Sequence, residues 1–355
     1  MLEQNPSPAL EAKHEELRLW GWSTLVSLTI TVVILLCLGA MLNIQETWRQ
    51  IVACNKTLLM LGGLAHYVTY LVRGYRWQRC LAHVSSPCQW RMFGLLIFFA
   101  NGVDNAVPGK LADVYAAHLA RINCGVRRAT AMGALVFLRM VDAWVVLLLA
   151  AGASWWLFAT SLPRAVLWSL LLGVCIAGGV TLVLLAFVLS EMVVPTWLPA
   201  RGHQMIHAFH TGLWPPSSQL GLIIVLTSLI WGLESVWTVF LAVAFGIKVR
   251  LIQGIFLTMI PLLASALPLT PSGVGVVEVT MYSCLRLLDV SAATAASLTV
   301  VHRLIDYWLH MGVGVLLWAF RRPIGLRTWF EVSPPDAPGA QSSQRSLHEG
   351  ISYGA

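Results

Sequence analysis

The chain has 355 residues, of which 57% are hydrophobic and 11% charged, and its mean hydropathy is +0.74. Soluble domains carry about 25% charged residues, so this composition excludes an ordinary soluble enzyme and indicates several membrane crossings. The net charge of +7 is spread between apolar runs rather than gathered in one basic tract, so it does not indicate nucleic-acid binding. Many of the 16 Trp residues flank these runs, where indole rings favour the headgroup level of a bilayer.

The N-terminal end of the chain does not read as a signal peptide. Residues 1–20 are polar and rather acidic, and the apolar run from Ser23 to Leu42 is long and has no cleavage site. We therefore expect an N-terminal tail over residues 1–20, followed by a first membrane span. A span needs about 20 mostly apolar residues. The clear candidates are 22–42, 165–190, 218–245 and 295–319, and two weaker ones are 57–73 and 130–151.

Two further apolar stretches, 92–120 and 251–288, are interrupted by polar residues, Pro and Gly. Pro lacks a backbone donor and Gly weakens a helix, so we expect both stretches to break. Backbone groups freed at membrane depth must be buried in protein or line a water-filled cavity. Each stretch is therefore predicted to form a re-entrant hairpin of two short helices. The alternative is an interfacial loop followed by a surface helix.

The predicted fold is thus an all-α polytopic membrane protein with about six transmembrane helices and two re-entrant broken-helix hairpins. With the N-terminus in the cytoplasm, 15 of the 23 Lys and Arg residues fall on the cytoplasmic side, six fall outside and two lie within spans. Cytoplasmic loops carry the excess of positive charge, so we expect an inner-membrane protein with both termini in the cytoplasm. The membrane domain covers 21–320, and 321–355 is expected to be a disordered tail.

An internal repeat divides the membrane domain into halves at about 21–155 and 160–320. Chance rarely matches Arg, Asp and Trp together in spans where charge is scarce. Each half contains three spans and one hairpin, so the second half is predicted to be inverted relative to the first. Inverted repeats with broken helices are typical of transporters. A shift of 164 residues places Gly109 on Gly273, Ala129, Thr130 and Ala131 on Ala293, Thr294 and Ala295, Arg139 on Arg303, Asp142 on Asp306, and Trp144 on Trp308.

Both repeats carry an ion pair candidate inside a span. Arg139 and Asp142 are three residues apart, so they share a helix face and can neutralise one another, and Arg303 and Asp306 repeat this spacing. Ionisable residues at membrane depth are costly and are therefore candidates for a functional site. Arg also suits the phosphate of a lipid headgroup. The alternative is that both pairs only lock a span to a hairpin.

The breaks supply a second set of candidate substrate-binding residues. Backbone amides at a helix start attract anions, and both breaks offer such amides within a predicted enclosure. The alternative for the second break is a plain tight turn. Neither break has the strand and glycine spacing of a nucleotide-binding loop. The candidates are Asn101, Asp104, Asn105, Gly109, Lys110 and Asp113 at the first break, and Pro271, Ser272, Gly273, Gly275 and Glu278 at the second.

Glu234 lies inside an apolar run with no basic neighbour one turn away. It could be a protonatable coupling residue, the partner of a charge on another span, or simply protonated. The seven Cys residues are scattered and predict neither a zinc site nor a disulfide framework. His203, His207 and His210 share one face, but an interfacial helix is favoured over a metal site. We find no catalytic motif, and we expect no cofactor and no metal.

Three strings resemble the lysylphosphatidylglycerol synthase transmembrane region, also called the flippase-like domain family, which includes hopanoid-associated membrane proteins. They are RGYRWQRCL at 73–81, VPGKLADVYAAHLAR at 107–121, and LPLTPSGVGVVEVTMY at 267–282 followed by HRLIDYW. The resemblance implies a membrane protein that binds or translocates an amphipathic lipid. Synthase activity in multidomain relatives belongs to a separate soluble domain, so we do not expect it here. Lys110 and Ser272 depart from the family pattern, which leaves the headgroup preference open.

The sequence therefore predicts a lipid flippase or transporter that holds an anionic or amphipathic headgroup in a central intramembrane cavity. It contains no ATP-binding motif, so a gradient or downhill flow is expected to drive lipid movement. The expected partners are membrane lipids, and lipid-modifying enzymes or glycosyltransferases are further candidates. Two alternatives remain open. One is a membrane enzyme, or a subunit of one, that acts on a polyprenyl-linked or other lipid, and the other is a non-catalytic scaffold.

Overall fold

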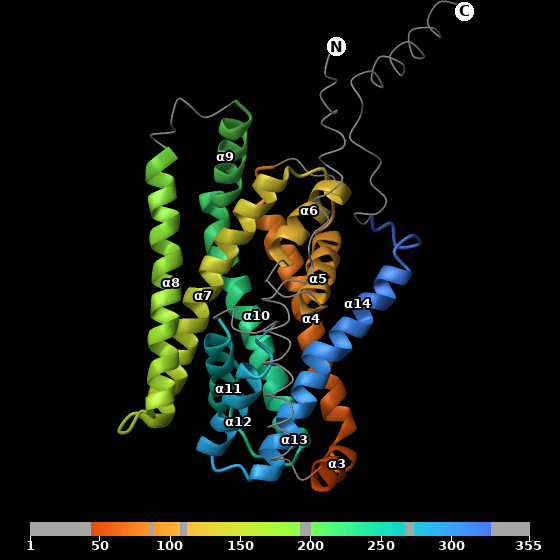
Figure 1. Ribbon diagram of the computed structural model, residues 1–355, viewed down its shortest axis with the longest axis vertical. Helices are drawn as coiled ribbons and strands as arrows, with labels where there is room; N and C mark the ends of the chain where they lie inside the picture. Colours follow the sequence, from red (N-terminus) through yellow and green to blue (C-terminus); the bar gives the residue numbers. More distant parts are fainter. Residues whose placement is uncertain (1–43, 85–87, 107–111, 192–199, 267–272, 328–355) are drawn as a thin grey trace, which may run out of the picture.

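The protein is α-helical throughout the part of the chain that the computed structural model describes, which is residues 44–84, 88–106, 112–191, 200–266 and 273–327 (Figure 1). The predicted first span at 22–42 and most of both terminal tails lie outside these ranges. The first half contains α3 (Ile44–Ala53), α4 (Lys56–Cys80), α5 (Trp90–Ala106), α6 (Ala112–Cys124) and α7 (Arg128–Phe158). The second contains α8 (Arg164–Glu191), α9 (Ala200–Leu213), α10 (Ser217–Ala244), α11 (Leu251–Ala264), α12 (Val276–Leu287), α13 (Ala292–Arg303), the π-helical segment η2 (Leu304–Leu309) and α14 (His310–Ala319).

Three of the described helices, α7, α8 and α10, are long and apolar enough to cross a membrane. A fourth span results if α3 and α4, which meet at an angle of 85°, are counted as one broken span. The helices α8 and α10 agree closely with the predicted spans 165–190 and 218–245. The weaker candidates 57–73 and 130–151 prove to be parts of the longer helices α4 and α7. The predicted span 295–319 runs through α13, η2 and α14, so its helix changes pitch midway.

Both interrupted stretches consist of two short helices that pack against each other, α5 with α6 and α11 with α12. The α5–α6 pair lies in the upper half of Figure 1, and the α11–α12 pair lies in the lower half. The helix contacts of the two halves also correspond. The corresponding pairs are α4–α5 and α10–α11, α6–α7 and α12–α13, α7–α9 and α13–α3, and α7–α11 and α14–α5.

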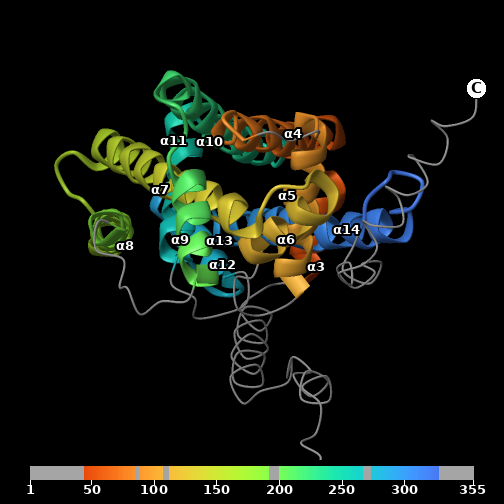
Figure 2. The same cartoon turned by 90° about the horizontal axis from the view of Figure 1, so that it is seen from above.

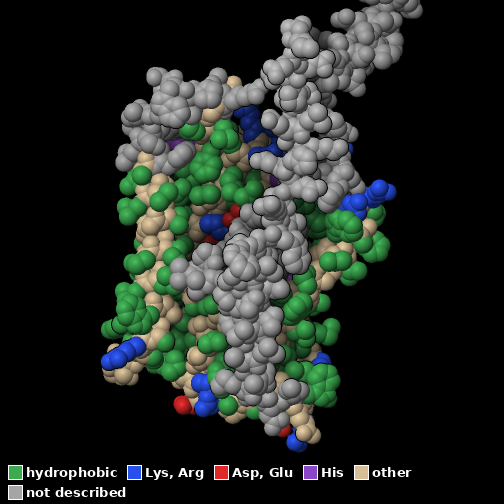
Figure 3. Space-filling model, in the orientation of Figure 1, with side chains coloured by type: hydrophobic (Ala, Val, Ile, Leu, Met, Phe, Trp, Pro, Cys, Tyr) green, Lys and Arg blue, Asp and Glu red, His purple; other side chains and the backbone are tan. Residues whose placement is uncertain are grey.

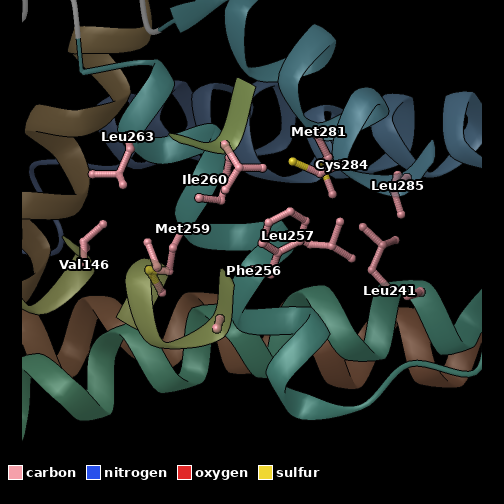
Figure 4. Close-up of a cluster of buried hydrophobic side chains, with 14 of the residues drawn as sticks. Val146, Leu241, Phe256, Leu257, Met259, Ile260, Leu263, Met281, Cys284 and Leu285 are labelled. Atoms are coloured by element: carbon pink, nitrogen blue, oxygen red, sulfur yellow. The ribbon is translucent and has the colours of Figure 1, made fainter. Parts of the chain in front are cut away.

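The helices enclose two buried apolar cores. One core lies among α4, α5, α6 and the N-terminal part of α7, around Trp77, Phe93 and Leu119. The other lies among α10, α11, α12 and the C-terminal part of α7, around Phe256 and Leu257 (Figure 4). Viewed from above, α8 stands at the edge of the molecule beside α7, and α14 stands at the opposite edge (Figure 2). The helices α4 and α10 pack closely together, and the two cores meet along this contact.

Glycines allow the central helices to approach closely. A Cβ atom on Gly74 of α4 would overlap the backbone of Gly94 on α5, and one on Gly254 of α11 would overlap the Val239 side chain of α10. The helix α9 approaches α7 in the same way, because Gly212 and Gly133 leave no room for a side chain where these helices meet. Small residues at such crossings are typical of membrane helices, which depend on close packing for their association.

The cysteines at the ends of the α5–α6 hairpin form a disulfide that the sequence did not indicate. Cys88 lies just before α5 and Cys124 ends α6, with 5.3 Å between their Cα atoms. The scattered cysteines gave no indication of this disulfide, because the hairpin brings together two residues that are 36 positions apart. Residues after α14 also pack on this hairpin, since Asn123 exchanges hydrogen bonds with the backbone of Arg327 at 3.0 and 2.8 Å.

We predict that Gly74→Ala lowers the free energy of unfolding by about 1–3 kcal/mol, because the added methyl group meets backbone that cannot move aside. Gly221→Ala is the matched control, since Gly221 is an exposed position on α10 with open space around it. Thermal unfolding of the purified variants in detergent measures both effects. Equal stability of the two variants would contradict the close α4–α5 contact.

Candidate functional site

The helix α4 carries a row of basic and aromatic side chains on one face. It begins at the cap Asn55, whose side chain accepts a hydrogen bond from Leu58 N at 3.2 Å, and it continues to Cys80. His66, Arg73 and Arg76 are spaced by seven and three residues, so they share a face of this helix. The apolar pattern placed the end of this span near residue 73 and assigned both arginines to a cytoplasmic loop. That placement was wrong, because α4 carries both of them into the protein interior.

Arg76 forms a buried ion pair with Asp142 of α7. The guanidinium donates two hydrogen bonds to the carboxylate, at 2.6 and 3.0 Å, and a third to Thr227 of α10 at 2.7 Å. The indole of Trp231 also donates to Asp142, at 3.0 Å. A buried ion pair is tolerated only when its remaining polar atoms are well satisfied, as they largely are here. This pair therefore ties α4, α7 and α10 together at one point.

Glu234 of α10 is held by three donors on α4. His66 Nδ1 lies 2.8 Å from one carboxylate oxygen, and Thr69 and Arg73 donate to the other at 3.2 and 3.1 Å. Of the three interpretations that the sequence left open, the structure therefore favours the partner of a charge on another span. The basic partners were not found because they lie 161 and 168 residues away in sequence.

The two repeat-related arginines each hold a carboxylate from the first turn of the helix after a break. Arg139 of α7 donates two hydrogen bonds of 2.9 Å to Asp113 of α6. Arg303 at the end of α13 donates one of 2.7 Å to Glu278 of α12. Charge pairing between equivalent elements therefore repeats in the two halves.

The predicted neutralisation of Arg139 by Asp142 was wrong. Arg139 pairs with Asp113 and Asp142 pairs with Arg76, because the neighbouring helices α6 and α4 offer better-directed partners than the next turn of α7. Arg303 does lie near Asp306, but at 3.7 Å, and its shorter contact is with Glu278. A spacing of three residues permits contact but does not ensure it, since side chains lean towards whichever partner the packing supplies.

The second break is closed by a glycine turn around Glu278. Gly273 and Gly275 have φ values of +67° and +90°, which residues with a Cβ atom rarely adopt. The backbone N–H of Gly275 donates to the carboxylate of Glu278 at 2.6 Å, so this carboxylate caps its own helix while it binds Arg303. These three residues, predicted as candidates from the break alone, thus form one unit.

A cavity of about 250 Å³ lies between the two halves and brings together several of the predicted residues. Asn101 and Arg139 reach it from the first half, and Glu234, Arg303 and Asp306 from the second. A small second cavity shares Arg73, Asn101 and Arg139 with the first and extends to Asp113 and Asp142. In the space-filling view, acidic and basic side chains meet at mid-height of a face that is otherwise largely hydrophobic (Figure 3).

Some predicted residues lie outside the described parts of the chain. Gly109, Lys110, Pro271 and Ser272 belong to the breaks themselves. Asp104 and Asn105 lie in the last turn of α5, and their side chains are also outside the description. Among the described residues, no three His, Cys, Asp or Glu side chains gather as a metal site would require.

The cavity residues that the sequence analysis missed are His66, Arg73 and Arg76. The two arginines belong to the string RGYRWQRCL, which indicated the family but gave no role to either arginine. From the sequence, His66 had no assigned role, although it is 2% exposed and lies between two carboxylates. Only the packing of α4 against α10 shows that these residues face the same space.

The sequence profile of the family described as the lysylphosphatidylglycerol synthase TM region matches residues 24–314. The chain belongs to this family. The resemblance inferred from the three strings is therefore confirmed. Both the family and the apolar helices indicate a multi-pass membrane protein.

Several UPF0104 membrane proteins of archaea are similar to this chain. The one from Methanocaldococcus jannaschii is 24% identical over 220 residues, which are 61% of this chain and 92% of the relative. One from Methanothermobacter thermautotrophicus is 33% identical over 92 residues, and one from Pyrococcus horikoshii is 26% identical over 89 residues. Each match covers about a quarter of this chain and 27% of the relative. The similarity over most of the first relative indicates a shared membrane domain.

We predict that Asp142→Ala lowers the free energy of unfolding by about 3–5 kcal/mol, because it leaves the buried Arg76 charge without its partner. Asp113→Ala is the comparison and should cost about 1 kcal/mol or less, since the Asp113 and Arg139 side chains are 28% and 49% exposed. Thermal unfolding in detergent measures both.

The double variant Arg76→Met with Asp142→Leu should recover most of the loss, because no unpaired charge remains. A double variant as unstable as Asp142→Ala would contradict this account of the pair.

Proposed function

We propose that the chain is a lipid transporter of the flippase type, whose central cavity receives an anionic or amphipathic headgroup while the acyl chains stay in the bilayer. The observation that carries this proposal is the presence of both Arg139 and Arg303, which occupy equivalent positions in the repeat, in the wall of one cavity. Guanidinium groups at such a place suit the phosphate of a headgroup.

The arrangement of the two halves supports alternating access. The hairpins α5–α6 and α11–α12 lie at opposite ends of the molecule, α9 of the second half packs on α7 of the first, and α3 of the first half packs on α13 of the second. Such an exchange is expected when two halves are related by an axis in the membrane plane. We propose that the halves rock about the α4–α10 contact, so that the cavity opens first to one leaflet and then to the other.

The carboxylates of the site favour binding over catalysis. An acid–base catalyst needs a carboxylate that can reach the reacting atom. Glu234 accepts from His66, Thr69 and Arg73, and Glu278 accepts from Gly275 and Arg303. These contacts occupy both of these carboxylates, which leaves Asp306 as the described cavity-lining carboxylate most open to the cavity, so Glu234 and Glu278 give the enzyme alternative less support than transport.

Mass spectrometry of co-purified lipids tests the proposal. We expect one lipid class to be enriched with the wild-type chain and lost from Arg303→Ala, because the cavity then lacks one of its phosphate-binding groups. Arg303→Lys should retain part of the enrichment, since it keeps the charge but loses the planar donor geometry.

Arg164→Ala is the matched control, because Arg164 is an exposed residue at the start of α8, away from the cavity lining. The same bulk lipids with all of these variants would overturn the proposed headgroup site and place the scaffold alternative first.

We also propose that the base of the α5–α6 hairpin faces the cytoplasm, as the distribution of Lys and Arg predicts, and that the reducing cytosol opens the disulfide at this base in the cell. Cys88 and Cys124 mark this base. In a variant that keeps only these two cysteines, a membrane-impermeant maleimide applied after reduction should label inverted vesicles and leave intact cells unlabelled. Labelling of intact cells would reverse the orientation.

A further inference from the structure

We propose that His66 and Asp306 form a proton-binding site that loads a proton together with the headgroup, which makes the transporter proton-coupled. The inference rests on the proposed function, and it adds the coupling ion and the residues that bind it. His66 lies on α4 in the first half, and Asp306 lies on η2 in the second. Both line the cavity between the halves.

The contacts of His66 decide where its hydrogen lies. Nδ1 is 2.8 Å from Glu234, whose carboxylate also accepts from Thr69 and Arg73. The guanidinium of Arg73 beside this carboxylate favours its ionised form, which can only accept, so the ring hydrogen belongs on Nδ1. The other ring nitrogen, Nε2, then carries a lone pair.

That lone pair points at a second carboxylate. Nε2 of His66 has no hydrogen-bond partner within bonding distance, and Asp306 Oδ1 lies 3.6 Å from it. Two unprotonated acceptors at this distance repel, whereas a proton on Nε2 beside the ionised Asp306 turns the contact into a charge-assisted hydrogen bond. The gap between these two atoms is therefore a place that a proton stabilises.

Access to this place comes from the cavity. The His66 side chain is 2% exposed, whereas that of Asp306 is 35% exposed. A proton from cavity water therefore reaches Asp306 first and is then shared with His66. The π-helical turn of η2 widens the helix at Asp306, and such turns are frequent at functional sites.

Other groups around His66 set the balance of charge at the site. On its own helix these are Tyr67, Tyr70 and Arg73, and the facing elements add Glu234, His302, Arg303, Asp306 and His310. Among the described residues that line the two cavities or pair with a lining residue, five carboxylates face four guanidinium groups.

Arg303 links the proton to the headgroup. Its guanidinium lies 3.7 Å from Asp306 Oδ2 and binds Glu278 on its other side. An anionic headgroup competes with Asp306 for this guanidinium, and a proton on the Asp306–His66 pair removes the competitor. Headgroup and proton therefore bind cooperatively, and each must raise the affinity for the other by the same factor. Release of the headgroup on the far side returns the proton to water.

Calorimetric titration with short-chain phosphatidylglycerol, in two buffers of different ionisation enthalpy, measures proton uptake. We expect the wild-type chain to take up about one proton per lipid bound at neutral pH. Asp306→Asn and His66→Gln should bind the lipid with little or no uptake. His83→Gln is the matched control and should behave as wild type, because His83 is an exposed histidine that lies away from the cavity lining. Lipid binding without uptake in the wild type, or uptake that survives in both variants, would overturn the proton site.

A second measurement needs no added phosphatidylglycerol probe, so it separates this inference from the proposed function. If no variant binds the probe, the headgroup site fails, and nitrogen-15 NMR of the histidines in nanodiscs still tests the proton site. We expect His66 Nε2 to gain a proton as the pH is lowered in the wild type, with a clear change in Asp306→Asn. A His66 signal that is the same in both and does not titrate would refute the shared proton.

Discussion

The structure depends on the pairing of charges that apolar helices carry into the protein. His66, Arg73 and Arg76 lie along one face of α4, and each meets a carboxylate from another element. Unpaired charges at membrane depth cost several kcal/mol, so the helices that carry these carboxylates must pack around α4. The contacts with Asp142 of α7 and Glu234 of α10 explain why α4 lies at the centre, where the two halves meet.

The same pairing joins the wall of the cavity to the two hairpins. Arg139 and Arg303 bind the carboxylates of Asp113 and Glu278, which begin the helices after the breaks. A headgroup that binds either arginine therefore acts on a hairpin as well as on a span. Since the two hairpins lie at opposite ends of the molecule, exchange of these contacts provides a physical route from headgroup binding to movement of one half against the other.

Hydropathy and the repeat predicted much of the fold but little of the pairing. The helices α8 and α10 and the two interrupted stretches follow from runs of apolar residues and from Pro and Gly, which act locally. The partners of Asp142 and Glu234 depend on how α4 packs, which no local pattern specifies. The charges of Arg73 and Arg76 also made α4 look shorter than it is, because arginines that are paired in the interior resemble loop arginines in sequence. The disulfide and the His66 contacts were missed because they also depend on the packing of residues that are distant in sequence.

An experimental structure of the chain in nanodiscs made from its own membrane lipids tests the central claim most directly. The account predicts density for one headgroup in the cavity between α4, α10 and η2, within hydrogen-bond distance of Arg303 or Arg139. A cavity that holds only water, with lipids confined to the outer apolar surface, would contradict it and leave the buried ion pairs as structural contacts alone.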